Sequence, residues 1–179
     1  TGVEFIVVGT CVSKRQQVNF SYKTYPHFSI IKALRISSGL PLIFNKVSID
    51  NEDYADGCLK ENTPISCFSS KEDIDKTIAI LLSSESVKYE STLQNYFYNI
   101  ILCMTETMSE LQLKDYMDYT IHLNKIKMKS QTNITTQEKT DIIEYAYNET
   151  ISYLKQRNLK YEESSEVKKT FSKLTEQIN

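Results

Sequence analysis

The hydrophobic pattern at the start of the chain predicts two strands. Residues Val3–Val12 form a nearly continuous run of apolar and β-branched side chains, which is typical of a strand buried on both faces. Val18, Phe20 and Tyr22 then alternate with polar residues, as expected of a strand with one buried face.

A short helix and two extended segments are predicted next. The helix covers Ser29–Ser37, and its apolar stripe consists of Ile30, Ile31 and Leu34. Gly39 is placed to end this helix, and Pro41 prevents it from resuming because proline lacks a backbone N–H. Extended segments follow at 42–50 and on the approach to Tyr54.

The middle of the chain predicts two more strands and a long helix. Residues 75–84 have the composition of a buried strand, and residues 119–128 alternate apolar and polar side chains. Between them, a helix is expected within Ser91–Leu113. Its apolar stripe, expected to face the core, consists of Leu93, Tyr96, Phe97, Ile100, Ile101, Met104, Met108 and Leu111.

Two helices are predicted toward the end of the chain. Thr135 and Glu138 form a capping box for a helix that runs to about Gln156. This helix is expected to bury Ile142, Ile143, Ala146, Ile151 and Leu154. A last helix is expected to contain Val167, Phe171, Leu174 and Ile178. Apolar strands that alternate with helices predict an α/β layered fold, with a mostly parallel central sheet flanked by helices.

The composition excludes some classes of function. The 179 residues carry 21 Lys and Arg against 23 Asp and Glu, a net charge of −2, so we expect no nucleic-acid partner. No apolar run approaches the roughly 20 residues that span a bilayer. The opening segment lacks the basic flank and cleavage site of a signal peptide.

The cysteines favour a reducing compartment. Cys11, Cys58, Cys67 and Cys103 show no C-x-x-C spacing, and with only two histidines they form no zinc pattern. Four buried free thiols are the expected state, with two disulfides as the alternative. We therefore expect an intracellular, cytoplasmic protein and no metal.

The segment Tyr54–Ile65, "YADGCLKENTPI", places one of only four glycines directly after an aspartate, at what looks like a strand end. Asp-Gly is a common turn dipeptide, because glycine accepts positive φ without steric cost. In α/β sheets, however, reactive groups also gather where strands end. Both interpretations of Asp56 and Gly57 are open on these residues alone.

Two segments together resemble the patatin-like acyl hydrolases, the patatin-like phospholipases. Residues matching a family helix and the loop after it are Ala33, Ser37, Ser38, Pro41 and Phe44. Residues matching the family's Asp-Gly turn and its Asn-x-Pro continuation are Tyr54, Asp56, Gly57, Cys58, Asn62 and Pro64. The resemblance covers roughly residues 1–85, and Cys58 stands where the family has Gly or Ala. It implies that residues 1–157 are the C-terminal part of a patatin-like domain and that 158–179 are a helical extension.

The resemblance also implies a reaction. The family hydrolyses lipid acyl esters with a serine–aspartate dyad, so Asp56 would be the general base, with Gly57 and Cys58 as the supporting turn. A serine hydroxyl needs such a base to become a good nucleophile. The expected partners are a lipid or phospholipid substrate and, transiently, a membrane surface; no cofactor is expected.

The family's serine lies in Gly-x-Ser-x-Gly, but Gly2, Gly9, Gly39 and Gly57 bracket no serine in this way. The nucleophile and the oxyanion hole are therefore expected upstream of Thr1. Two alternatives remain: a non-catalytic interaction domain that keeps the family scaffold, and an unrelated small-molecule-binding α/β domain.

Four other polar residues have simpler explanations. Ser37 and Ser38 lie near a helix end, where turn or packing roles are common, although a serine there could be a nucleophile. His122 is expected to be a strand residue that faces solvent or a neighbour, and His27 a loop residue after Pro26.

We expect a polypeptide of residues 1–179 to have no esterase activity, because no Gly-x-Ser-x-Gly nucleophile occurs in it. The measurement is the release of nitrophenol from a short-chain nitrophenyl ester. Turnover above the uncatalysed rate would show that a nucleophile of another kind, such as Ser37 or Ser38, is present.

Overall fold

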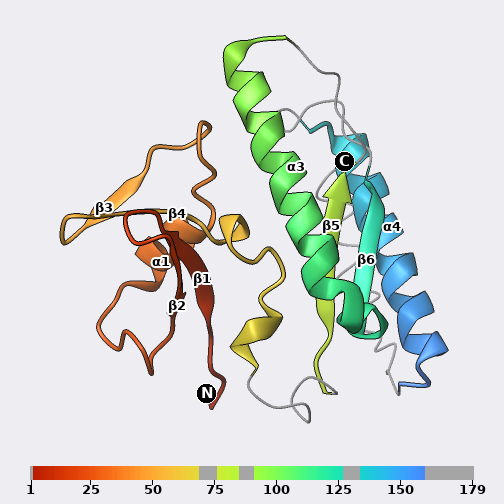
Figure 1. Cartoon of the computed structure of the whole chain (residues 1–179). Coiled ribbons are helices and arrows are strands. Elements are labelled where there is room, and N and C mark those ends of the chain that lie inside the picture. Colours follow the sequence, from red (N-terminus) through yellow and green to blue (C-terminus); the bar gives the residue numbers. More distant parts are fainter. Residues whose placement is uncertain (1, 69–75, 85–90, 127–133, 160–179) are drawn as a thin grey trace. The chain divides into compact units, whose positions relative to one another are not determined.

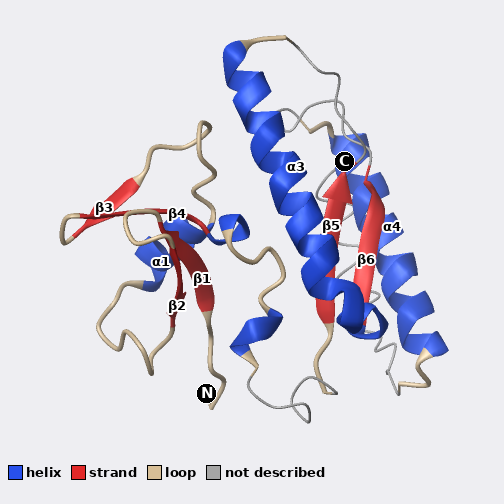
Figure 2. Ribbon diagram, in the orientation of Figure 1, coloured by secondary structure: helices blue, strands red, loops and turns tan. Residues whose placement is uncertain are grey.

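The computed structural model describes residues 2–68, 76–84, 91–126 and 134–159 (Figure 1). The chain divides into two compact units, which are described separately. The first comprises 1–79 and 90–120, and the second comprises 80–89 and 121–179. Helices and strands occur in both units (Figure 2), which confirms the predicted α/β class.

A four-stranded sheet forms the centre of the first unit. Its order is β2 (Gln16–Phe20), β1 (Val7–Cys11), β4 (Glu52–Asp56) and β3 (Val47–Ile49). Every residue of β1 is buried, as the apolar run predicts, although the strand is shorter than that run. The register places Gly9 of β1 opposite Asp56 of β4.

The pairing within this sheet is antiparallel, contrary to the prediction of a mostly parallel sheet. Tight connections explain the difference, because a hairpin joins only antiparallel strands. Asp50 and Asn51 join β3 to β4 with φ of 49° and 62°, the left-handed pair that a two-residue hairpin turn requires. Residues 12–15 join β1 to β2, with Arg15 at φ 58°.

Helix α1 (Ile30–Ser37) packs against the sheet with one narrow side. Ala33 and Ile36 are buried with Val7 and Phe20 in one core cluster. The predicted stripe stays exposed instead: Ile30, Ile31 and Leu34. The helix ends before Gly39 as predicted, and the Gly39 N–H donates to the Ile36 carbonyl at 2.9 Å.

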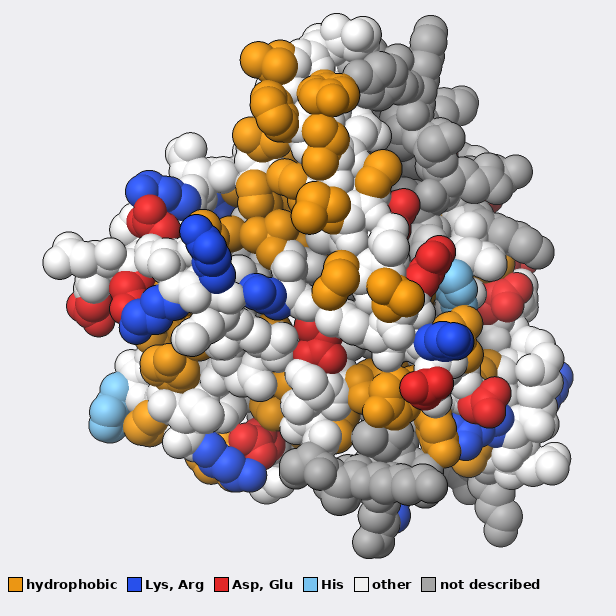
Figure 3. Space-filling view, in the orientation of Figure 1, with side chains coloured by type: hydrophobic (Ala, Val, Ile, Leu, Met, Phe, Trp, Pro, Cys, Tyr) orange, Lys and Arg blue, Asp and Glu red, His pale blue; other side chains and the backbone are white. Residues whose placement is uncertain are grey.

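Helix α3 (Leu93–Leu113) lies within the predicted bounds, but the apolar face that was predicted to be buried is exposed. Its buried residues are Thr105, Ser109 and Leu113. Seven of the eight residues predicted to face the core are between 38% and 74% exposed, namely Leu93, Tyr96, Phe97, Ile100, Met104, Met108 and Leu111. They form the hydrophobic patch over α3 in Figure 3.

The buried hydroxyls of α3 find partners within the helix. Thr105 Oγ1 donates to the Leu102 carbonyl at 3.0 Å, and Ser109 Oγ donates to the Thr105 carbonyl at 2.8 Å. Burying these hydroxyls therefore leaves no hydrogen-bonding group unsatisfied. The small side chains allow α3 to contact the 3₁₀ turn Gly57–Leu59.

The second unit contains β5 (Ala79–Ser84), β6 (Thr120–Ile126) and α4 (Thr136–Gln156). β5 and β6 pair with each other, and their arrows run in the same direction in Figure 1, as the prediction of parallel strands requires. β5 is not buried on both faces: Ala79 and Leu81 are buried, whereas Ile80 and Leu82 are exposed.

Helix α4 begins at the predicted capping box. The Glu138 N–H donates to Thr135 Oγ1, and Glu138 Oε2 accepts from the Thr135 N–H at 2.8 Å. Its apolar side chains are half-buried and pack in part on Ile121, Leu123 and Ile126 of β6. The helix expected through 167–178 lies outside the described residues, as does the predicted extension from residue 160 onward.

The four cysteines are free thiols, as predicted. Their burial differs from the prediction: Cys11 is buried, Cys58 and Cys67 are half-buried, and Cys103 is exposed on α3. The helices that the structure describes include none with the length and hydropathy of a membrane span.

We expect the Ile36→Ala substitution to lower the free energy of unfolding by about 2–5 kcal/mol, because it leaves a cavity between α1 and the sheet. Ile36 is 0% exposed, whereas Ile31 on the same helix is 79% exposed. The matched Ile31→Ala variant should change stability by less than about 0.5 kcal/mol. Urea unfolding followed by circular dichroism measures both values, and equal losses would contradict this packing.

Candidate functional site

Asp56 lies where the sequence places it, at the end of a strand. It is the last residue of β4 and the N-cap of the 3₁₀ turn Gly57–Leu59. Its Oδ1 atom accepts a hydrogen bond from the Cys58 N–H at 2.8 Å. A capping aspartate of this kind holds its own carboxylate in a fixed orientation.

Glycine is needed at position 57 for a different reason than the sequence suggests. Its φ is not positive, so left-handed backbone does not explain the residue. A Cβ atom at Gly57 would lie 2.6 Å from the Val8 carbonyl oxygen, closer than real Cβ atoms approach. Gly57 therefore permits the turn to pack directly on the backbone of β1.

The backbone of Asp56 is held from two sides. Thr10 Oγ1 on β1 donates to the Asp56 carbonyl at 2.8 Å, and the Asp56 N–H donates to the Gly39 carbonyl at 3.1 Å. Gly39 follows α1, so this second bond joins the two segments that carry the family resemblance. A Cβ atom at Gly39 would lie 2.9 Å from the Ile36 carbonyl oxygen, so this position also excludes a side chain.

A hollow of about 340 Å³ surrounds the Asp56 turn. Six of its lining residues occupy positions of the two sequence motifs: Ser37, Asp56, Gly57, Cys58, Asn62 and Pro64. Its other walls are Phe5, Ile6, Val7 and Val8 from the first strand region, Leu34 from α1, and Glu61. Residues far apart in the sequence therefore meet around one carboxylate.

The Cys58 side chain is uncharged at neutral pH. Burial raises the pKa of its thiol to about 12, and the charge of Asp56 and its hydrogen bond with the thiol act in the same direction. Cys58 is therefore a poor nucleophile, since the thiolate is the reactive form. Asp56 retains hydrogen-bonding capacity, because a carboxylate accepts about four hydrogen bonds.

Glu61, the second carboxylate at the hollow, is engaged elsewhere. It is buried and accepts hydrogen bonds from the Ser66 N–H, at 2.9 Å, and from the Ser66 hydroxyl. In the described ranges, no group of three or more His, Cys, Asp or Glu side chains could hold a metal ion.

The remaining candidate side chains lie in varied places. Ser38 donates from Oγ to the Leu34 carbonyl at 2.9 Å, which confirms a role at the helix end. Ser37 lines the hollow, but no hydrogen bond joins it to Asp56, and both lie in the described part of the chain. His27 is an exposed loop residue as predicted. His122 lies 2.9 Å, through Nε2, from Ser83 Oγ on β5, a neighbour on the paired strand.

Sequence reasoning missed several residues of the site. Thr10 and Gly9 stood within an apolar run, and only the register shows that they lie beside Ala55 and Asp56. The sequence pattern places Phe5 in a strand and Leu34 on the apolar stripe of a helix. It does not indicate that both residues line the hollow.

Comparisons with known proteins agree with this arrangement. Residues 4–68 match the sequence model of the family described as patatin-like phospholipase, a range that contains both motif segments. The chain is 27% identical over 117 residues to "Probable lipid hydrolase 463L" of Invertebrate iridescent virus 6, which covers 62% of the chain. The chain spans 40% of that relative's length.

A solved structure shares the fold. VipD from Legionella pneumophila matches 86% of the chain and 31% of its own length, with a TM-score of 0.59 and 15% sequence identity. The two motif segments that meet at Asp56 therefore both lie within residues 4–68, the part of the chain that is similar to patatin-like phospholipases.

Proposed function

We propose that this protein is a lipid acyl hydrolase of the phospholipase A type, in which Asp56 is the general base of a serine–aspartate dyad. The substrate is an acyl ester of a glycerolipid, and no metal or organic cofactor takes part. The proposal places the protein inside the cell, in transient contact with a membrane surface.

The observation that carries this proposal is the meeting of two motif segments at one carboxylate. Ser37 comes from the segment around α1, and Asn62 and Pro64 follow the Asp-Gly turn. The hydrogen bond from the Asp56 N–H to the Gly39 carbonyl joins these segments directly. A plain surface turn would need neither this bond nor the fit of Gly57 against Val8.

The proposal assigns the nucleophilic serine and the oxyanion hole to a part of the protein outside residues 1–179. Asp56 accepts the serine proton while the serine oxygen attacks the ester carbonyl carbon. The tetrahedral intermediate then expels the glycerol oxygen, which takes the proton from Asp56. In the second half of the reaction, Asp56 takes a proton from water while the water oxygen attacks the acyl-serine carbonyl carbon. The intermediate then expels the serine oxygen, which takes the proton back from Asp56, and the fatty acid is released.

Both the carboxylate and the apolar walls of the hollow suit this chemistry. Asp56 has a fixed orientation, because Oδ1 accepts the Cys58 N–H and both backbone groups of the residue are hydrogen-bonded. Phe5, Val8 and Leu34 give the opposite walls an apolar character suited to the start of an acyl chain. The uncharged Cys58 thiol adds no second negative charge beside the base.

We expect Asp56→Asn in the full-length protein to lower kcat by about 10²–10⁴-fold, because general-base catalysis contributes about this much. The melting temperature should change little, since an asparagine oxygen can still cap the turn at the Cys58 N–H. The measurements are kcat on a phospholipid substrate and thermal unfolding of the same preparation.

Asp53→Asn is the matched control on the same strand. Asp53 pairs with Lys46 at 2.6 Å on the exposed side of β4 and does not line the hollow. Its substitution should leave kcat within about twofold of the unsubstituted protein, as expected of a surface change. If both variants retain full activity, Asp56 is only a turn residue. If the full-length protein hydrolyses no acyl ester, a non-catalytic interaction domain explains the chain better.

A further inference from the structure

We propose that a pocket lined by Glu61 binds a primary ammonium group, an inference that does not depend on the role of Asp56. This Glu61 pocket has a volume of about 380 Å³, within the roughly 300–1,000 Å³ typical of small-molecule sites. Its walls come from β2, from the 3₁₀ turn Ile65–Cys67 with its neighbours, and from the end of α3 and the turn after it. The lining residues that carry the inference are Gln17, Glu61, Ser66, Phe68, Gln112 and Tyr116.

Glu61 is a buried carboxylate without a cationic partner. It is 8% exposed, and in the described part of the chain no Lys, Arg or His forms an ion pair with it. Glu61 also lines the Asp56 hollow, and the described lining residues of both sites include no basic side chain. Burial of a carboxylate is costly unless a positive charge compensates for it. The Glu61 pocket therefore lacks a cation.

The hydrogen bonds of Glu61 fix its position and leave part of its capacity unused. Its Oε1 atom accepts the Ser66 N–H at 2.9 Å, and Oε2 accepts the Ser66 hydroxyl. Gln17 Nε2 donates to Ser66 Oγ at 3.2 Å, which leaves the hydroxyl proton for Glu61. Both donors to Glu61 are neutral, and a carboxylate accepts about four hydrogen bonds. About two positions therefore remain for the N–H groups of a ligand.

Gln112 provides a second acceptor without a donor. Its Nε2 atom donates to the Lys60 carbonyl at 2.9 Å, which fixes the identity of the free end of the amide as Oε1. This Oε1 atom is buried and has no hydrogen-bond partner, an unfavourable state for a polar atom. An N–H donor in the pocket would satisfy it. Glu61 and Gln112 together favour a ligand that is positively charged and donates hydrogen bonds.

The aromatic side chains of the pocket favour an organic cation. Phe68 and Tyr116 line it, and aromatic rings attract cations through their faces. A metal ion is a poorer match, because in the described ranges no group of three or more His, Cys, Asp or Glu side chains could hold one. A primary ammonium group has three N–H donors and one positive charge. It therefore matches the carboxylate, the amide oxygen and the rings.

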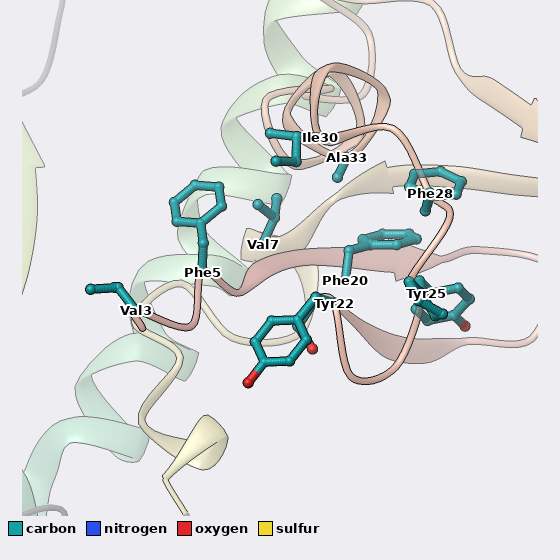
Figure 4. A pocket seen from close by; sticks show the side chains of 11 residues that line it. Val3, Phe5, Val7, Phe20, Tyr22, Tyr25, Phe28, Ile30 and Ala33 are labelled. Atoms are coloured by element: carbon teal, nitrogen blue, oxygen red, sulfur yellow. The ribbon is translucent and has the colours of Figure 1, made fainter. Parts of the chain in front are cut away.

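The aromatic cavity of the same unit provides a comparison. It has a volume of about 340 Å³, and its walls include the rings of Phe20, Tyr22 and Phe28 (Figure 4). Its described lining residues include no charged side chain. This cavity offers rings without a carboxylate, so an ammonium ligand should prefer the Glu61 pocket.

The test is an NMR titration of the ¹⁵N-labelled chain of residues 1–179 with propylammonium chloride, with sodium chloride as the control for ionic strength. Propylammonium should shift the side-chain amide signals of Gln112 and the backbone signal of Ser66. It should bind about tenfold more tightly than propan-1-ol, because charge-assisted hydrogen bonds are roughly twice as strong as neutral ones. Tetramethylammonium, which has no N–H donor, should also bind more weakly.

Two pairs of substitutions locate the site. Glu61→Gln keeps the size of the side chain and removes its charge, so it should weaken propylammonium binding about tenfold. Glu110→Gln is the matched control, because Glu110 is exposed on α3 and does not line the pocket. It should leave the affinity within about twofold, as expected of a surface change.

The second pair tests an exposed wall, where a substitution does not threaten the fold. Phe68 is 42% exposed, and Phe68→Leu should weaken binding by about two- to fivefold, the range of an exposed cation–π contact. Phe97→Leu is its control, because Phe97 is 48% exposed and does not line the pocket. It should leave the affinity unchanged. Circular dichroism checks the fold of all four variants, and the Phe68 pair decides if Glu61→Gln does not fold.

The ammonium group has two sources, a soluble amine or the ethanolamine head group of a lipid. Vesicles of phosphatidylethanolamine and of phosphatidylcholine have the same net charge. Sedimentation with the first alone, lost in Glu61→Gln, supports the pocket and identifies a lipid head group. Binding of propylammonium without a vesicle preference supports the pocket and identifies a soluble amine.

Four results overturn the assignment, whether or not the protein hydrolyses esters. Propylammonium does not bind, or binds no more tightly than propan-1-ol. Tetramethylammonium binds as tightly as propylammonium. The shifts are confined to Phe20 and Tyr22 of the aromatic cavity. Each substitution of a pair has the same effect as its control.

Discussion

The direct contact between the Gly57 backbone and the Val8 carbonyl is the constraint on which the candidate site depends. With no Cβ at position 57, the 3₁₀ turn lies against β1 without a side chain between them. At this distance Thr10 reaches the Asp56 carbonyl, and Asp56 in turn reaches Gly39 after α1. A larger residue at position 57 would push the turn away from β1 and strain these bonds. The orientation of the carboxylate therefore follows from backbone packing.

Two hollows of the first unit have complementary chemical characters. Around Asp56 the walls combine the carboxylates of Asp56 and Glu61, the uncharged Cys58 thiol and apolar side chains. The adjoining cavity has aromatic walls and no charge. The two cavities share the lining residues Phe5 and Val7.

Local signals in the sequence predicted local structure well. The capping box at Thr135 placed the start of α4 correctly, because both of its hydrogen bonds lie within four residues. The periodicity of apolar residues predicted helix α3 but not which of its faces is buried. A repeat of 3.6 residues shows which residues share a face, whereas burial depends on what that face contacts. The sequence likewise placed Asp56 at a strand end, but the need for Gly57 came from Val8, a residue on another strand. Antiparallel pairing followed from turns such as Asp50–Asn51, whose positive φ values the pattern of apolar residues does not encode.

The way α3 is fastened has a mechanical consequence for Asp56. The buried hydroxyls of α3 donate hydrogen bonds within the helix, so the buried face makes few hydrogen bonds to its neighbours. Two side-chain amides of α3 make such bonds instead: Gln94 donates to the Leu42 carbonyl at 3.0 Å, and Gln112 donates to the Lys60 carbonyl at 2.9 Å. At 1.5 Å per residue these anchors are about 27 Å apart along the helix. One carbonyl precedes β4 and the other follows the Asp56 turn. Helix α3 is thus a rigid connection between Leu42 and Lys60, the two ends of the segment that carries the Asp56 carboxylate. Force applied to the exposed apolar face of α3 would be transmitted to both ends of this segment.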